Sequence, residues 1–184
     1  MPMLNVLTQA PKIVRHTVVQ GEYEVSRDPH LVLTTVLGSC IACCLFDPAA
    51  RIGGMNHFLL AVPPHSSHGL GGDAQRYGLY AMEVLINEML NQGALRATMR
   101  AHLYGGANMH EGMRAIGTEN AEFAEEFLRA DNIRLVRSDT GGVHARRLDL
   151  QPATGRVRCQ SVQGDFPAAR PVRTPVLSGE VEFF

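Results

Sequence analysis

The chain has 184 residues, of which 45% are hydrophobic and 19% are charged, and its formal net charge is −1. These values are typical of an ordinary soluble globular protein of one domain that can bury a core. The near-neutral charge argues against nucleic-acid binding, and no apolar run reaches the length of about 18 residues that predicts a membrane span. Because the first 15 residues lack the architecture of a signal peptide, we expect a cytoplasmic protein.

The first part of the chain predicts strands. After a Pro-containing lead-in at 1–15, the alternating, Val- and Tyr-rich stretch 16–26 predicts a half-buried strand. The apolar run 30–48 predicts a strand before Gly38-Ser39 and a short strand or helix after it. Residues 51–64 predict a further strand that pairs with this run through an Asp-Pro turn.

The clearest helix covers 76–92, after a Gly/Ser loop at 66–75, and Gly93 supplies its C-terminal stop. Its apolar residues recur at three- and four-residue steps and are expected to form one buried face that covers the core: Leu79, Met82, Leu85, Ile86, Met89 and Leu90.

The next segment predicts a strand at 99–109 that runs into the turn Gly105-Gly106. Thr118 is placed to cap a second helix at 119–131, and Asn132 to end it in the left-handed conformation.

The last part of the chain predicts a strand at 133–139, a Gly-Gly turn, and a hairpin at 144–162 with Ala-Thr-Gly at its tip. Together the elements predict an α+β fold in which at least two helices cover one face of a sheet. The predicted organisation is a lead-in at 1–15, a domain at 16–165 and a Pro-rich tail at 166–184.

Three of the four cysteines, Cys40, Cys43 and Cys44, lie in one apolar stretch, "TVLGSCIACC". They are open to four interpretations: a zinc site completed by His57, a Cys40–Cys43 dithiol, a single nucleophile, or buried core. Cys40 is distinguished because it follows Gly38-Ser39, where the chain can turn sharply and expose a thiol beside backbone N–H groups. His57, on the expected neighbouring strand, is the candidate base.

Five blocks of sequence, taken together, resemble the CheD family, the chemoreceptor glutamine deamidases of bacterial chemotaxis. They are "TTVLGSCIACCLFDPAARIGGMNHFLL" (34–60), "RYGLYAMEVLINEML" (76–90), "YGGANM" (104–109), "IGTEN" (116–120) and "DTGGVHARRLDLQPATGRV" (139–157). Three features depart from the family pattern. The N-terminal lead-in is longer, the segment "HFLLAVPP" (57–64) stands where the family has a shorter one, and Val143-His144 stand where the family tends to have polar or basic residues.

The resemblance implies an α/β/β sandwich with mixed sheets, similar to the catalytic domain of deamidating bacterial toxins. It implies Cys40 as a thiolate nucleophile, His57 as the base, and Thr34, six positions before the cysteine, as the residue that orients His57. Backbone N–H groups near Ser39 and Cys40, after Gly38, are expected to hold the oxyanion. No cofactor and no metal are expected.

The implied reaction converts specific glutamines of methyl-accepting chemoreceptors to glutamate through a Cys thioester and releases ammonia. A CheC-type phosphatase is implied as a further partner. Gly105 and Gly106 are either simple turn residues or positions that let a receptor helix approach the backbone. A non-catalytic adaptor that binds receptors or such a phosphatase is the alternative function.

Overall fold

The structure, a computed structural model, describes residues 12–60, 71–109 and 115–162. Its elements follow one another as β1 Val14–Thr17, β2 Tyr23–Ser26, β3 Leu31–Leu37, β4 Ile41–Asp47, β5 Ile52–Asn56, α1 Gly71–Asn91, the 3₁₀ turn η1 Arg96–Thr98, β6 Arg100–Gly105, α2 Ile116–Ala130, β7 Arg134–Thr140, β8 Ala145–Gln151, the 3₁₀ turn η2 Pro152–Thr154, and β9 Arg156–Val162.

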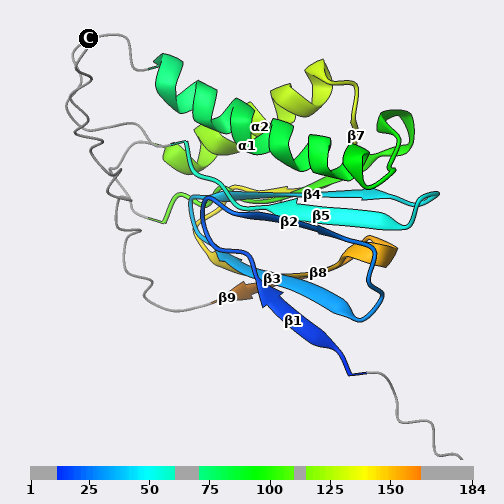
Figure 1. Ribbon diagram of the computed structural model, residues 1–184. Helices are drawn as coiled ribbons and strands as arrows, with labels where there is room; N and C mark the ends of the chain where they lie inside the picture. The colour runs from blue at the N-terminus through cyan, green and yellow to red at the C-terminus, as the bar shows by residue number, and fades with distance from the viewer. Residues whose placement is uncertain (1–11, 61–70, 110–114, 163–184) are drawn as a thin grey trace, which may run out of the picture.

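The strands form two sheets that pack face to face, and α1 and α2 cover the outer face of one of them (Figure 1). The five-stranded sheet has the order β2-β5-β4-β6-β7, and the four-stranded sheet has the order β1-β3-β8-β9. Both sheets are mixed, since β1–β3 and β6–β7 pair in parallel and the other pairs are antiparallel. The predicted α/β/β sandwich of the α+β class is confirmed, whereas the similarity to deamidating toxins stays a prediction.

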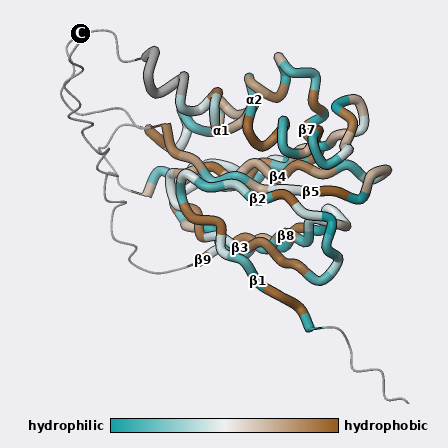
Figure 2. Tube along the Cα trace, viewed as in Figure 1, coloured by the Kyte–Doolittle hydropathy of each residue, from teal (hydrophilic) through white to brown (hydrophobic). Residues whose placement is uncertain are grey.

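The alternation of side chains along β4 divides the core into two parts. Ile41, Cys43 and Leu45 pack among the helix residues on one side of the sheet. Ala42 and Cys44 pack on the other side, against residues of the four-stranded sheet. Because both faces of β4 are buried, its sequence is a continuous apolar run. Figure 2 shows hydrophilic and hydrophobic residues alternating along α1 and α2 instead.

The prediction of one strand at 16–26 is wrong. The chain leaves the four-stranded sheet after β1, turns at Gly21 with φ of +92°, and enters the five-stranded sheet as β2. A positive φ of this size is easy only for glycine, which lets the backbone change sheets there. β1 begins at Val14, so residues 14 and 15 of the predicted lead-in are already strand.

The predicted hairpin of β4 and β5 is confirmed, and the segment after Gly38-Ser39 is a strand rather than a helix. Helix α1 begins at Gly71, inside the predicted loop 66–75. Of its predicted buried face, Leu79 is exposed and Leu90 half-buried, because they lie at the edge of the apolar stripe; the other four residues are buried. Residues 61–70 lie outside the described part of the chain.

The prediction that Thr118 caps the second helix is also wrong. Helix α2 begins two residues earlier, and the Thr118 hydroxyl instead accepts a hydrogen bond from the side chain of Asn108 at 2.9 Å. The left-handed stop at Asn132, with φ of +56°, is confirmed. The hairpin of β8 and β9 with η2 at its tip is confirmed as well. No helix in the described ranges is long and apolar enough to span a membrane.

Candidate active site

Cys40 lies where the chain crosses from one sheet to the other. The bend Gly38-Ser39 joins β3 of the four-stranded sheet to β4 of the five-stranded sheet, and Cys40 is the residue that follows it. The loop after β6 fixes this bend, since Gly106 N–H donates to the Cys40 carbonyl at 2.8 Å and Ala107 N–H to the Gly38 carbonyl at 2.9 Å. The thiol is therefore held at a rigid junction of the two sheets.

Asn120 of α2 fixes the same bend from the other side. Its Nδ2 donates to the Ser39 carbonyl at 2.8 Å, and its Oδ1 accepts from Leu60 N–H at 2.7 Å. The Asn120 side chain is fully buried, so these bonds compensate its loss of water. A single amide thus ties the bend before Cys40 to the segment that follows His57.

His57 comes directly after β5, and strand register places it beside Cys40. The bridge between Ile41 and Phe58 continues the β4–β5 pairing, so His57 lies opposite Ala42. Cys40 and His57 therefore point to the same face of the sheet as diagonal neighbours, a relationship that brings long side chains within reach of each other. Only 6% of Cys40 and 7% of His57 is exposed. The predicted proximity of these two residues agrees with this register.

A hydrogen-bond chain fixes the proton on His57. The Thr35 hydroxyl lies 2.9 Å from His57 Nδ1 and donates its own proton to the Val18 carbonyl at 2.8 Å. The hydroxyl has one proton, so it must accept from Nδ1–H. The Val18 carbonyl, which can only accept, is also 3.4 Å from Nδ1. His57 therefore carries its proton on Nδ1, and Nε2 keeps a free lone pair.

Nε2 of His57 is buried and has no hydrogen-bond partner within the described ranges. A buried polar atom without a partner costs free energy, and functional sites are where such atoms persist. Here the unpaired atom is the basic nitrogen on the face that carries the Cys40 thiol, which is the arrangement that a proton-accepting base needs.

The prediction that Thr34 orients His57 is wrong by one residue. Side chains alternate along β3, and the inner face carries Leu33, Thr35 and Leu37, all buried. Thr34 points to the opposite face of this sheet and is only half-buried. Thr35, 3% exposed, makes the contact that the sequence assigned to Thr34.

Burial at the site acts against the thiolate form of Cys40 that the resemblance implied. Burial raises the pKa of Cys40 to about 11, although the residue's own backbone N–H, which faces the sulfur, opposes this shift. Burial lowers the pKa of His57 below its ordinary value, and the Val18 carbonyl partly opposes that shift. Both shifts favour a thiol and a neutral imidazole over an ion pair at neutral pH.

The two other cysteines of the stretch do not join Cys40 in a cluster. Cys43 points toward the helices, on the face of β4 opposite to Cys40 and Cys44. Cys40 and Cys43 are three residues apart along an extended chain, about 10 Å, which is too far for a disulfide. No metal-binding group of three or more His, Cys, Asp or Glu occurs in the part of the chain that the structure describes. Cys43 and Cys44 are buried free thiols.

Gly105 and Gly106 serve the chain's own packing. A Cβ on Gly105, whose φ is +110°, would lie 2.1 Å from the Cys40 carbonyl oxygen, and one on Gly106 would lie 2.7 Å from the Gly117 carbonyl oxygen. Both glycines are buried, and the backbone that approaches them in this structure is that of the chain itself. They position the site by letting β6 and α2 close on the bend before Cys40.

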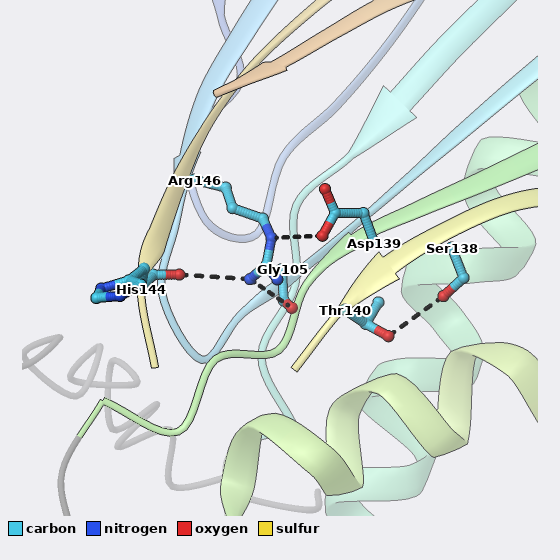
Figure 3. Close-up of polar contacts among 6 residues, drawn as sticks. All are labelled: Gly105, Ser138, Asp139, Thr140, His144 and Arg146. Carbon is cyan, nitrogen blue, oxygen red and sulfur yellow. Dashed lines mark hydrogen bonds and ion pairs between the residues drawn. The ribbon is translucent and has the colours of Figure 1, made fainter. Parts of the chain in front are cut away.

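Arg146 of β8 supports Gly105 from the four-stranded sheet (Figure 3). Its Nε donates to Asp139 Oδ1 at 3.0 Å, and its Nη1 donates to the carbonyls of Gly105 and His144, each at 3.4 Å. In the same view the hydroxyls of Ser138 and Thr140 lie 3.2 Å apart on β7. Arg146 therefore links β8 to Asp139 of β7 and to the Gly105 carbonyl beneath the bend.

Sequence reasoning missed Asn120 and the carbonyl of Val18. The helical pattern could have indicated that Asn120 is buried, because it lies on the same face of α2 as the buried residues Gly117, Ala121, Ala124 and Leu128. An amide on an apolar face needs internal partners. Val18 acts through its backbone, so its side chain gives no signal.

Comparison with known proteins identifies relatives over almost the whole chain. The family model described as CheD chemotactic sensory transduction matches residues 59–161. A protein of Zymomonas mobilis subsp. mobilis named probable chemoreceptor glutamine deamidase CheD is 53% identical, over 92% of this chain and 92% of the relative. A protein of Caulobacter vibrioides with the same name is 50% identical, over 94% and 95%. A solved structure, that of Bacillus licheniformis hypothetical protein YfiH, aligns with a TM-score of 0.46 at 12% identity, over 74% of this chain and 62% of the other.

Proposed function

This chain belongs to the CheD family, and on that premise we propose that it is a glutamine deamidase of chemoreceptors. The reaction replaces the side-chain amide of a receptor glutamine by a carboxylate and releases ammonia. The observation that carries the proposal is the state of His57: Thr35 and Val18 hold its Nδ1–H, which leaves the Nε2 lone pair free on a residue that shares a face of the sheet with Cys40.

The first step starts from a neutral pair. Because burial raises the pKa of Cys40 to about 11, the proposed step starts from a thiol. As Sγ attacks the amide carbon, the S–H proton passes to His57 Nε2, and the carbonyl oxygen becomes an oxyanion. The Cys40 backbone N–H, which faces Sγ, is the proposed backbone donor to that oxygen.

The second step releases ammonia. The imidazolium of His57 gives its proton to the amide nitrogen, the C–N bond breaks, and a thioester between Cys40 and the substrate carbonyl remains. A water molecule then gives a proton to Nε2 and adds to the thioester carbon. The C–S bond breaks, Cys40 recovers its proton, and the substrate leaves as glutamate.

The proposed substrate is a glutamine on the cytoplasmic helices of methyl-accepting chemoreceptors, which also places this chain in the cytoplasm. A CheC-type phosphatase is the proposed regulatory partner. Co-elution of the two purified proteins from a sizing column tests the partner, and separate elution at micromolar concentration would remove it from the proposal.

The activity is tested with a receptor fragment, the wild-type protein, and the variants Cys40→Ala and Cys43→Ala. Mass spectrometry of receptor peptides follows the conversion of glutamine to glutamate, and an ammonia assay follows the leaving group. We expect conversion by the wild type and by Cys43→Ala, which alters a buried thiol on the opposite face, and none by Cys40→Ala. If the wild type binds the fragment but converts no glutamine, the protein is an adaptor and the proposal fails.

A further inference from the structure

The side-chain amide of Gln20 contacts the thiol of the candidate nucleophile, Cys40. It lies in the turn between β1 and β2, and the Cys40 thiol donates a hydrogen bond to its Oε1 at 3.5 Å. The proton transfers described above, through Cys40, His57 and Thr35, give this amide no part. Its position calls for a chemical account, because a side chain that touches the sulfur also borders the space where the substrate reacts.

The position of the oxyanion follows from bonding. In the tetrahedral adduct the oxygen that carries the negative charge is two bonds from Sγ, so it lies within a short reach of the sulfur. A hydrogen-bond donor must then lie about 2.7–3.1 Å from that oxygen to stabilise it. A group that contacts Sγ at 3.5 Å before the reaction is within reach of this position.

The side chain of Gln20 suits both states of the thiol. In the resting enzyme the S–H group needs an acceptor, and Oε1 supplies it. Once the proton has moved to His57, a donor is needed instead, and rotation about the broad terminal torsion of glutamine presents its NH₂ group. Gln20 neither gains nor loses a proton in this exchange, so the proton balance of the reaction is unchanged.

The turn that carries Gln20 is anchored to the base itself. Gly21 N–H donates to the His57 carbonyl at 2.7 Å, and His57 N–H donates to the Glu22 carbonyl at 3.0 Å. Glu22 also accepts from Val19 N–H through its carboxylate at 3.1 Å. The backbone that carries Gln20 is thus held in a fixed relation to His57, so the amide needs only rotation about its terminal torsion to present its NH₂ group.

We propose that the Gln20 side-chain amide is a catalytic oxyanion donor, which acts together with the backbone N–H of Cys40. The inference rests on the proposed deamidase function. It assigns to residue 20 a role that sequence reasoning gave only to backbone groups near Ser39 and Cys40.

The test compares Gln20→Leu and Gln20→Glu with the control Gln160→Leu, which removes an exposed glutamine on β9. Both Gln20 variants lose the NH₂ donor; Gln20→Glu keeps the length of the side chain, and Gln20→Leu shortens it by one bond. We expect kcat on the receptor fragment to fall about 10²- to 10³-fold in both, with KM changed much less, and the control to match the wild type. Thermal midpoints of all variants show whether each one is folded.

Alkylation of Cys40 by iodoacetamide separates the donor role from an effect on the thiol. Alkylation uses the sulfur but forms no oxyanion, so its rate in Gln20→Leu should stay within a few-fold of the wild-type rate. A parallel loss of alkylation and turnover would show that Gln20 acts on the sulfur, and would overturn the proposal. Unchanged kcat in a folded Gln20→Leu would overturn it as well.

Two further outcomes separate this inference from the proposed function. If the wild type alkylates normally but converts no glutamine, the proposed function fails and the inference falls with it. If the wild type is active but peptide mapping finds residue 20 already converted to glutamate, only the inference fails, since a carboxylate has no N–H to donate.

Discussion

The hydroxyl of Thr35 lies 2.9 Å from Nδ1 of His57, and the two residues come from different sheets. Thr35 belongs to β3 of the four-stranded sheet, and His57 follows β5 of the five-stranded sheet. The orientation of the base therefore depends on the packing of the two layers, and this contact forms only when the sandwich is assembled.

Removal of the Thr35 hydroxyl should impair catalysis without loss of the fold. In Thr35→Val the imidazole loses the acceptor that fixes its tautomer, and we expect kcat to fall about 10- to 100-fold with KM little changed. Steady-state deamidation of the receptor fragment measures this. The control is Thr34→Val, on the opposite face of β3, which should stay within about twofold of the wild type. A large loss of kcat in Thr34→Val with little change in Thr35→Val would show that Thr34 is the orienting residue.

The pH profile of kcat/KM reports the protonation of His57 in the free enzyme. Burial lowers the pKa of His57, so the base stays neutral until the pH falls below its ordinary value of about 6.5. Activity should therefore be constant near neutral pH and decline only on the acid side of that value. A decline centred above pH 7 would mean that the imidazolium is stabilised in the resting enzyme.

The pH dependence of alkylation tests the state of Cys40. Iodoacetamide reacts with the thiolate, and the Cys40 pKa is raised to about 11 by burial. The rate of Cys40 alkylation should be slow at neutral pH and should rise tenfold per pH unit up to the limit of protein stability. A rate that is already constant near neutral pH would indicate a resting thiolate–imidazolium pair.

Asn120→Ala should destabilise the protein and reduce turnover together. The substitution leaves the Ser39 carbonyl and Leu60 N–H without partners, at a cost of about 1–3 kcal/mol for each group that stays buried. Urea denaturation measures the free energy of unfolding, and Asn91→Ala, at the exposed end of α1, is the matched control. An Asn120→Ala protein as stable and active as this control would show that the bend before Cys40 does not need the amide.

A comparison of Gly105→Ala with Gly141→Ala separates the effect of backbone strain from the effect of steric contact near Cys40. In Gly105→Ala the new Cβ meets the Cys40 carbonyl oxygen, whereas in Gly141→Ala it meets nothing within 4 Å. Both variants carry the strain of a positive φ, about 1–3 kcal/mol, so a greater loss of stability in Gly105→Ala measures the contact. Thermal unfolding and deamidation rates compare them, and equal losses would contradict the tight packing of Gly105 on the bend.

Much of the fold could be predicted because local patterns determine it. The apolar run before Asp47-Pro48 and the strand after it gave the β4–β5 hairpin, and Gly93 and Asn132 marked where helices end. The structure of residues 16–26 was harder to predict. This stretch contains parts of two short strands with a similar alternation of polar and apolar residues, and the turn at Gly21 sends them to different sheets. That division depends on tertiary pairing, which a single sequence does not display.

A residue of the candidate site could be predicted when two conditions held: its side chain carries the proposed chemistry, and the pairing of adjacent strands determines which residue lies next to it. Cys40 and His57 met both conditions, because the hairpin register brings them to one face. The choice between Thr34 and Thr35 depends on which face of β3 packs inward, and a shift by one residue reverses it. Val18 and Gln20 contribute through a crossover between sheets, so their contacts follow from the assembled sandwich alone.

The most direct test of the account is to trap the thioester on Cys40. Wild-type protein and a receptor fragment are mixed, quenched in acid within the first turnover, and examined by intact-mass and peptide mass spectrometry. We predict a covalent adduct with the mass of both partners less one ammonia, mapped to Cys40, released by hydroxylamine and absent in Cys40→Ala. An adduct on another residue, or continued deamidation by Cys40→Ala, would contradict it.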